Sequence, residues 1–201
     1  MTRSRKYSAG RFALAAAVAV VATLAHAEVP KLDRVRVVET PRAIADAAFT
    51  DEDGRTAHLQ DLRGKVVFVL FGFTNCADVC PLTLERLGQF RDGSGLNAAD
   101  VAYAMISVDG ERDTPAVMKE FLARYPEEFI GLTAPPNQVT PVAQQFSAAF
   151  FKGAHDAHGH YDVAHSPQIF VLDAAGNLRA ELFGASIESM KAVALALLAE
   201  R

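Results

Sequence analysis

The pattern of apolar and polar positions predicts strands that alternate with helices. Two short runs, 66–71 and 101–108, are almost entirely apolar, which is typical of buried strands. The segments between and after these runs instead repeat apolar residues at the spacing of one helix face. They are expected as helices over 82–90, 115–125, 141–150 and 187–198.

Turn residues predict two hairpins around this alternation. The first spans 49–62, with Asp53-Gly54 at its turn, because an Asp-Gly pair readily adopts the positive φ that a tight turn requires. The second joins 168–172 to 178–183 across a short polar loop. A further run, 129–132, is expected as a short edge strand.

Three helix starts carry recognisable capping residues. Thr114-Pro115 and Thr140-Pro141 each combine a capping side chain with a proline at the first helical position, and Ser186 caps the last helix. Strands that alternate with helices imply a central sheet covered on both faces, and a parallel pair followed by a hairpin makes that sheet mixed. The predicted fold class is therefore α/β, a central mixed β-sheet flanked by helices, with an N-terminal β-hairpin.

The N-terminus is predicted to be a targeting segment. Residues 1–27 combine a basic start, an apolar run over 12–25 and the small-x-small sequence Ala25-His26-Ala27. The run is shorter than the roughly twenty residues of a membrane span, so cleavage before Glu28 is favoured over an uncleaved anchor. The expected organisation is a signal peptide over 1–27, an extended arm over 28–46 and one domain over 47–201. We expect export to the periplasm, with attachment to the inner membrane only if the segment stays uncleaved.

Charge narrows the range of partners. The whole chain has a formal net charge of −4, and the targeting segment holds four basic residues and no acid. Its removal leaves 16 basic and 24 acidic side chains, a net charge of −8. Nucleic acids and anionic membrane surfaces require basic patches, so neither is expected as a partner.

The two cysteines of the chain lie in one short segment, Phe71–Pro81 (FGFTNCADVCP). A predicted strand leads into this segment and a predicted helix leads out. Free backbone N–H groups and the partial positive charge at a helix start favour thiolate over thiol. Cys76 and Cys80 are four positions apart; if that segment is helical, they lie on one helix face about 6 Å apart at their α-carbons.

This spacing allows more than one use of the two thiols. Two thiolates at that separation can share a soft metal ion, and an irregular turn would let them form a disulfide. A purely structural disulfide between Cys76 and Cys80 is the less favoured reading. It would close only a short loop and would therefore stabilise the protein little.

A histidine later in the chain is the candidate third ligand. His165 lies just before the predicted strand 168–172, where a loop end at the sheet edge can approach the cysteine turn. A lone loop histidine is more often a solvated surface residue. Thiolates select Cu(I), imidazole suits copper and zinc, and structural zinc sites usually have four ligands. With Cys76, Cys80 and His165 as three candidates, copper is preferred over structural zinc.

Three motifs in the same order resemble the Sco/SenC family of copper proteins. They are FGFTNCADVCP at 71–81, SVDGERDTP at 107–115 and YDVAHSPQIFVLD at 161–173. With the hairpin before them they cover about residues 45–200. The resemblance implies a thioredoxin-like fold and copper ligands at Cys76, Cys80 and His165. It also implies a role in assembling the copper centre of cytochrome c oxidase.

The chain departs from the family pattern at three positions near the expected ligands. Asn75 stands where a histidine is frequent, Ala77 where a proline often follows the first cysteine, and Ala164 where an aspartate commonly precedes the histidine. Ala164 removes a candidate hydrogen-bond acceptor for the histidine, and such partners commonly change metal affinity about 10–100-fold. Thioredoxin-like folds often carry a cis-proline in this region, so Ser166-Pro167 is expected to be cis.

Three more histidines crowd a predicted loop over 152–164. His155, His158 and His160 are expected to lie on a flexible solvated loop. The functional alternative is an auxiliary capture site that passes copper to the main one, because dense imidazoles bind Cu(II), Ni or Zn weakly.

Four charged residues of the first two motifs have a structural interpretation. Asp78 is expected as an acid at a helix start. Asp109, Arg112 and Asp113 are expected to form a hydrogen-bonded turn that ends in the Thr114 cap, rather than to bind metal.

Two classes of function remain open. The first is a copper carrier rather than an enzyme, which delivers copper to a cytochrome c oxidase subunit. Its other expected partner is a thiol reductant, which keeps the cysteines reduced for loading, or another copper chaperone. The second is a thiol–disulfide oxidoreductase, in which Cys76 attacks a partner disulfide and Cys80 resolves the mixed disulfide. Thioredoxin-type enzymes favour two intervening residues, whereas this chain has three. The oxidoreductase has no need of His165, whereas the copper site requires it.

Overall fold

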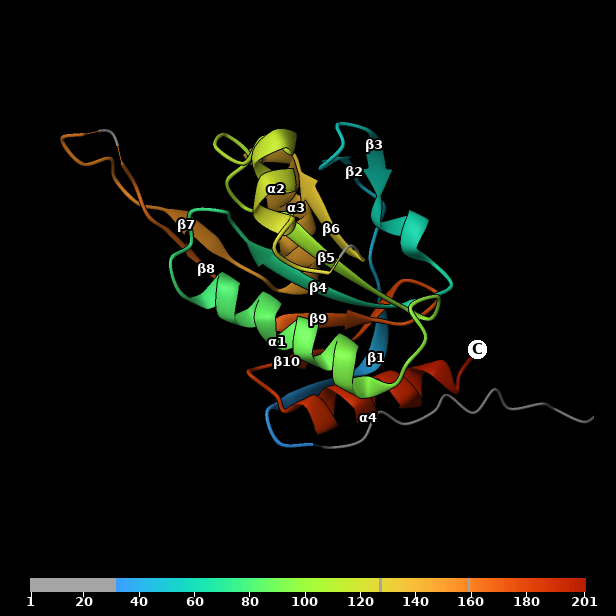
Figure 1. Cartoon of the computed structure of the whole chain (residues 1–201). Helices are drawn as coiled ribbons and strands as arrows, with labels where there is room; N and C mark the ends of the chain where they lie inside the picture. Colours follow the sequence, from blue (N-terminus) through green and yellow to red (C-terminus); the bar gives the residue numbers. More distant parts are fainter. Residues whose placement is uncertain (1–31, 127, 159) are drawn as a thin grey trace, which may run out of the picture.

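The computed structural model describes residues 32–126, 128–158 and 160–201 (Figure 1). The predicted signal peptide and residues 28–31 of the expected arm lie outside the described residues. In the part that is described, every helix is too short or too polar to cross a membrane.

A mixed sheet forms the centre of the described part of the chain. Its eight strands lie in the order β1-β10-β9-β4-β5-β6-β2-β3. Strands β4, β5 and β6 are parallel and the other neighbours are antiparallel, which confirms the predicted mixed sheet. The strands are β1 (Val35–Ala43), β2 (Ala48–Asp51), β3 (Thr56–His58), β4 (Val66–Gly72), β5 (Val101–Ser107), β6 (Phe129–Thr133), β9 (Ile169–Leu172) and β10 (Asn177–Leu182).

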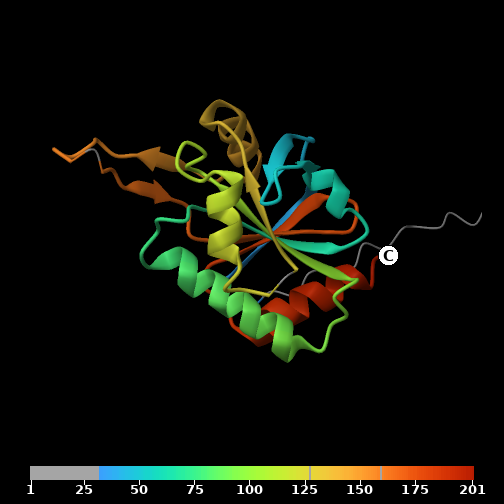
Figure 2. The ribbon, with the colours of Figure 1, turned by 45° about the horizontal axis from the view of Figure 1, so that its top comes forward.

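Helices cover both faces of this sheet (Figures 1 and 2). Three of them pack on one face, and the fourth packs on the other face together with a short 3-10 turn, Leu59–Leu62. The helices of the first face are α1 (Val79–Ser94), α2 (Pro115–Leu122) and α4 (Ile187–Leu198), and that of the second is α3 (Pro136–Phe146).

Strand β4 shows why the first apolar run is continuous. Its alternate residues enter different hydrophobic clusters: Phe68 packs under α1, and Phe71 packs under α3. Both faces of the strand are buried, so no position along it tolerates a polar side chain. The strand is therefore held rigidly up to Gly72, where the cysteine segment begins.

Two predicted elements differ in position. The run 129–132 was expected at a sheet edge, but β6 pairs with β5 on one side and with β2 on the other, because the N-terminal hairpin extends the sheet past it. The edge strands of the sheet are therefore β3 and, on the opposite side, β1, which lies within the expected extended arm.

The start of α3 is the second correction. The helix begins at Pro136, not at Thr140-Pro141, and ends at Phe146 instead of about residue 150. Two successive proline signals compete here, and Pro136 takes the first helical position. The Thr140 hydroxyl does not cap the helix but donates to the Pro136 carbonyl one turn earlier, at 2.8 Å.

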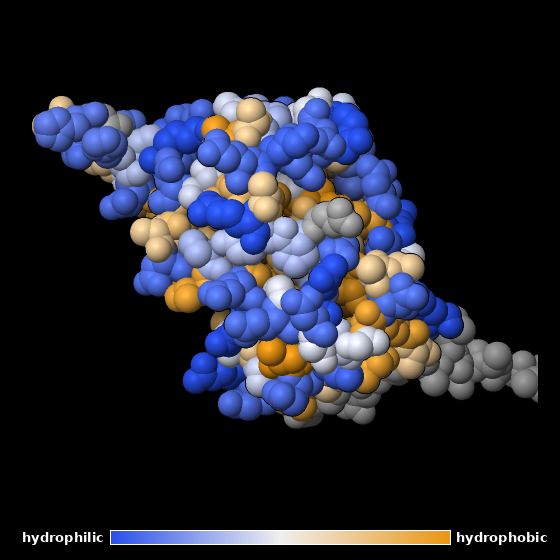
Figure 3. All heavy atoms as spheres, in the orientation of Figure 1, coloured by the Kyte–Doolittle hydropathy of each residue, from blue (hydrophilic) through white to orange (hydrophobic). Residues whose placement is uncertain are grey.

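The predicted histidine-rich loop is largely a hairpin. Strands β7 (Phe150–Lys152) and β8 (Val163–His165) form a separate antiparallel pair that projects from the body (Figures 1 and 2). Figure 3 shows a mostly hydrophilic surface at its projecting end. The described residues contain no cis peptide bond, so the expected cis Ser166-Pro167 is wrong. Ser166 instead extends the hairpin pairing, because its N–H donates to the Ala149 carbonyl at 2.9 Å.

Candidate metal centre

The two cysteines lie where β4 turns into α1, as the sequence predicts. Cys76 is half-buried in the turn, and Cys80 is fully buried in the first turn of the helix. Because α1 begins at Val79, Pro81 is the third helical residue. It still lies in the first turn, where a backbone N–H would have no partner within the helix.

Gly72 makes room for the buried thiol. A β-carbon at this position would lie 2.9 Å from the Sγ atom of Cys80 and 3.2 Å from a methyl group of Leu70. The φ angle of Gly72 is not in the left-handed region, so backbone conformation does not require glycine here. Close packing against Cys80 and Leu70 does. Sequence reasoning missed this role, although a glycine at the end of an apolar strand was the available signal.

The histidine hairpin brings the third side chain to the cysteines. The Nε2 atom of His165 lies 3.3 Å from the Sγ atom of Cys80 and 3.9 Å from that of Cys76. The three potential ligand atoms all lie within 4.8 Å of one another. Residues 85 positions apart in the chain are thus gathered around one point, as the sequence predicts; metal ligation itself stays a prediction.

The two thiols differ in acidity. Burial tends to raise the pKa of Cys76, but hydrogen bonds from the backbone N–H groups of Cys80, Asp78 and Val79 outweigh it, and the pKa is lowered. For Cys80, burial raises the pKa strongly, and the neighbouring Cys76 raises it further. Cys76 is therefore the more readily formed thiolate.

The environment of His165 suits a metal ligand. Burial lowers its pKa, which favours the neutral imidazole that binds metals. Its Nδ1 atom lies 3.1 Å from the carbonyl oxygen of Ser166. A hydrogen bond from Nδ1–H to this carbonyl leaves the lone pair of Nε2 directed towards the two sulfurs.

The geometry of β8 also shows why His165 does not depend on an acceptor side chain at position 164. Ala164 is exposed and, since neighbouring strand residues face opposite ways, its side chain points away from the face that carries His165. The backbone carbonyl of Ser166, rather than a side chain at position 164, is the hydrogen-bond acceptor for the Nδ1 atom of His165.

The second motif forms the hydrogen-bonded turn that the sequence predicts. The buried carboxylate of Asp113 accepts from the Thr74 N–H at 3.1 Å, the Thr74 hydroxyl at 2.6 Å and the Ser107 hydroxyl at 2.6 Å. Thr114 caps α2 by accepting from the Val117 N–H. Asp113 therefore supports the cysteine turn without joining the three potential ligands.

The other candidate residues lie outside the group of potential ligands. His155, His158 and His160 are exposed on the projecting part of the β7–β8 hairpin, and their role as a capture site stays a prediction. Asp78 is at the start of α1, where its side chain makes no capping hydrogen bond. The ring of Phe73 lies edge-on to that of His165, with centroids 5.7 Å apart, and forms an apolar wall beside the group.

Comparisons with known proteins agree with the fold and identify the family. The SCO1/SenC family model matches residues 38–196. The SCO2-like protein of Rickettsia felis is 30% identical over 151 residues, 74% of each chain. A putative copper-binding protein of Stutzerimonas stutzeri is 30% identical over 154 residues, 75% of each chain.

Solved structures show the same architecture. ScoI of Bradyrhizobium japonicum with copper bound has a TM-score of 0.68 and 29% identity, over 77% of this chain and 97% of that one. Yeast Sco1 with copper bound has a TM-score of 0.68 and 25% identity, over 75% of this chain and 85% of that one. The protein is thus an α/β domain of thioredoxin-like fold with two cysteines and a histidine at one end of its sheet. It belongs to the SCO1/SenC family.

Proposed function

We propose that this protein binds one copper ion through Cys76, Cys80 and His165 and delivers it during assembly of the copper centre of cytochrome c oxidase. The observation that carries the proposal is the convergence of two sulfurs and one imidazole nitrogen within 4.8 Å. Thiolate sulfur selects Cu(I), and three donors are one fewer than structural zinc requires. The copper-bound structures of two relatives support the same choice.

The acidities of the proposed ligands favour one order of loading. Cys76 offers a thiolate most readily, and His165 is held neutral, so both are ready to bind before the ion arrives. Cys80 must lose its proton as the metal binds, because burial keeps its pKa high. Half-buried Cys76 is also the more accessible of the two thiols, and we propose that it makes the first contact with the donor and the last with the receiving protein.

The partners follow from this chemistry. Both cysteines must be reduced before copper binds, so a thiol reductant is a proposed partner upstream. A copper chaperone is the proposed donor of the ion, and a cytochrome c oxidase subunit is the proposed receiver. The proposed location is the periplasm, which is oxidising enough for such a reductant to matter. Nucleic acid is not a proposed partner, and the membrane is one only if residues 1–27 are retained.

A thiol–disulfide oxidoreductase is the second candidate. It is favoured by one observation: Cys76, with a lowered pKa, lies beside a second free cysteine that can resolve a mixed disulfide. His165 separates the two functions, since thiol exchange has no chemical requirement for an imidazole ligand.

The number of copper ions bound per chain by the reduced domain, residues 28–201, distinguishes the copper carrier from the thiol–disulfide oxidoreductase. We expect one Cu(I) per chain in the wild type, a sharp loss of affinity in His165→Ala and no stable binding in the Cys76→Ala/Cys80→Ala variant. His58→Ala is the matched control, because this histidine pairs with Asp46 on a different part of the surface. Copper binding that is indifferent to His165, or absent from the wild type, would contradict copper delivery and favour thiol exchange.

A further inference from the structure

The turn of the second motif contacts both segments that carry the proposed ligands. On one side, Asp113 accepts hydrogen bonds from Thr74 in the cysteine turn. On the other side, Asp109 and Arg112 contact Tyr161, four residues before His165. A single short turn therefore lies between two segments that are far apart in the sequence.

Arg112 makes most of the contacts on the histidine side. Its guanidinium pairs with Asp109, donates from Nη1 to the Tyr161 carbonyl at 3.1 Å and lies over the Tyr161 ring at 3.7 Å. The Tyr161 hydroxyl donates to the same Asp109 carboxylate at 2.7 Å. Arg112, Asp109 and Tyr161 thus form a closed set of contacts, which fixes the backbone just before β8.

The same guanidinium also reaches the cysteine side. Its central carbon lies 5.8 Å from the centre of the Phe73 ring, and the edge-on contact with His165 is made by that ring. Arg112 is therefore in contact with residues on both sides of the proposed metal centre. A planar guanidinium is suited to this position because it can pair, donate and stack at the same time.

The strands of the histidine hairpin bury one side chain, Val163 of β8, in the core. Strands β7 and β8 have three residues each and are not part of the central sheet. An isolated two-stranded hairpin is marginally stable in water. Its other side-chain link to the same turn is an exposed ion pair between Lys152 and Glu111, and exposed pairs contribute little.

We propose that Arg112 is a positioning residue, which holds His165 against the cysteine turn without itself contacting the ion. The inference rests on the proposed function for its copper readout. Its structural readout, the contact between the rings of Phe73 and His165, is independent of copper.

Two variants test the proposal in the metal-free protein. Arg112→Gln removes the stacked, paired guanidinium. Lys152→Gln removes the exposed pair with Glu111 and the ammonium group that lies 4.0 Å from the centre of the Tyr161 ring, and leaves the contacts of Arg112 in place. We expect NMR to show the Phe73–His165 ring contact in the wild type and Lys152→Gln, and its loss in Arg112→Gln with the fold retained. Persistence of the contact in Arg112→Gln would overturn the proposal, as would an equal loss in Lys152→Gln.

A double-mutant cycle tests whether Arg112 acts through His165. We expect Arg112→Gln to weaken Cu(I) binding about 10–100-fold, as other residues that orient a metal ligand do. In the His165→Ala background the same substitution should change the affinity less than about threefold, because the two sites are coupled. Arg112→Lys should restore little of the Cu(I) affinity, since an ammonium group cannot replace the planar guanidinium that stacks and pairs at the same time. Equal losses in both backgrounds would show a general structural effect and overturn the proposal.

The two readouts separate this inference from the proposed function. A wild-type protein that binds no copper, but whose ring contact depends on Arg112, would refute copper delivery and leave the positioning role intact. A protein that binds copper through His165 with no dependence on Arg112 would support the proposed copper site and refute the positioning role.

Discussion

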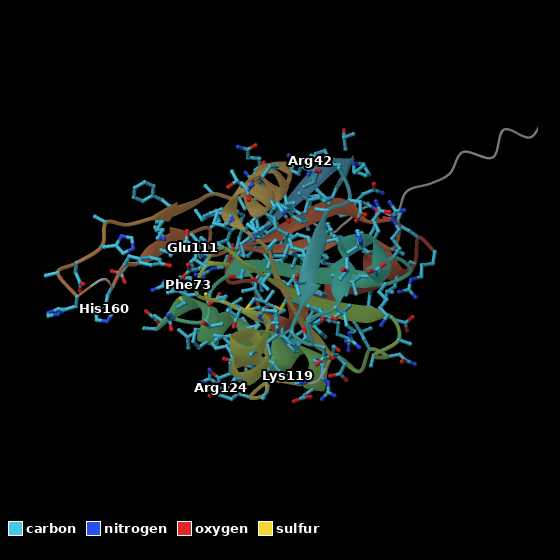
Figure 4. All side chains as sticks on the ribbon, turned by 90° about the horizontal axis from the view of Figure 1, so that it is seen from above. Arg42, Phe73, Glu111, Lys119, Arg124 and His160 are labelled. Carbon is cyan, nitrogen blue, oxygen red and sulfur yellow. The ribbon has the colours of Figure 1, made fainter. Side chains whose placement is uncertain are left out.

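The cysteine turn and the histidine hairpin reach the same point with very different support. Cys80 is fully buried under a strand that has neighbours on both sides and both faces covered. His165 ends a three-residue strand of a separate hairpin whose far end, marked by His160 in Figure 4, projects well away from Phe73 and the body. Cys80 is thus fixed by the core and Cys76 packs against it, whereas His165 lies on a hairpin whose strands bury one side chain, Val163, in the core.

This difference bears on how a carrier can both hold and release an ion. Ligands fixed by a core need little reorganisation to bind, which favours a prearranged pair of sulfurs. A ligand on a lightly attached hairpin can leave without disturbing that core, since short exposed elements open locally at low cost. We infer that His165 is the proposed ligand that separates most easily during transfer.

The largest expected effect is a difference in reactivity within the cysteine turn itself. At any pH below about 9, the ordinary value for cysteine, Cys76 should be alkylated at least about 100-fold faster than Cys80, because its pKa is lowered while burial raises that of Cys80. As the pH falls, labelling of Cys76 should persist to lower pH than for an ordinary thiol. Iodoacetamide labelling followed by tandem mass spectrometry measures both sites, and similar rates would contradict the assigned burial.

Removal of the carboxylate beneath the cysteine turn should be the largest effect on stability. Asp113→Ala leaves the buried hydroxyl of Ser107 and the groups of Thr74 without their acceptor. The expected loss is about 3 kcal/mol in the free energy of unfolding, since each unsatisfied buried group costs about 1–3 kcal/mol. Urea unfolding measures the loss. Asp78→Ala is the control, because this exposed acid makes no capping bond and should change stability only slightly.

Crowding of the buried thiol should have a somewhat smaller effect. Gly72→Ala places a methyl group 2.9 Å from the Sγ atom of Cys80, and overpacking of this kind costs about 1–3 kcal/mol. Gly93→Ala, within α1, meets nothing within 4 Å and should be neutral or stabilise the helix by up to about 1 kcal/mol. Thermal unfolding compares the two, and equal behaviour would contradict close packing at Gly72.

The smallest expected effect lies at the exposed end of the hairpin. Replacement of His155, His158 and His160 by Ala should leave Cu(I) affinity and stability unchanged, because all three are exposed and none joins the group of potential ligands. Copper binding at equilibrium and the rate of copper uptake measure the effect. Slower uptake at equal affinity would support the capture-site hypothesis, whereas unchanged uptake would argue against it. Weaker binding at equilibrium would contradict the separation of the two regions.

Local patterns predicted the cysteine region well. Strand β4, the turn and α1 each carry their signal within a few residues: a continuous apolar run, two spaced cysteines and a proline in the first helical turn. The Thr114 and Ser186 caps were read in the same way, and the structure confirms both.

Contacts between segments that are distant in the sequence could not be predicted from local patterns. Strand β7 is too short to show an alternating pattern, and its pairing with β8 depends on residues 11 to 15 positions away. The role of Tyr161 depends on Arg112, 49 positions earlier, and no local signal links them. At α3, Pro136 and the predicted Thr140-Pro141 start compete within one helix, and the helix that begins at Pro136 packs Val139 and Phe146 under the sheet.

Hydrogen exchange of the metal-free and Cu(I)-loaded protein tests the central claim most directly. Without copper, we expect slow exchange in β4 and faster exchange in β7 and β8; with copper, β8 should become protected while β4 changes little. Protection of β8 would show that the ion draws the hairpin to a prearranged pair of cysteines. If copper protects only the cysteine turn, or if β8 is as protected as β4 without copper, His165 is not the ligand that a lightly attached hairpin supplies.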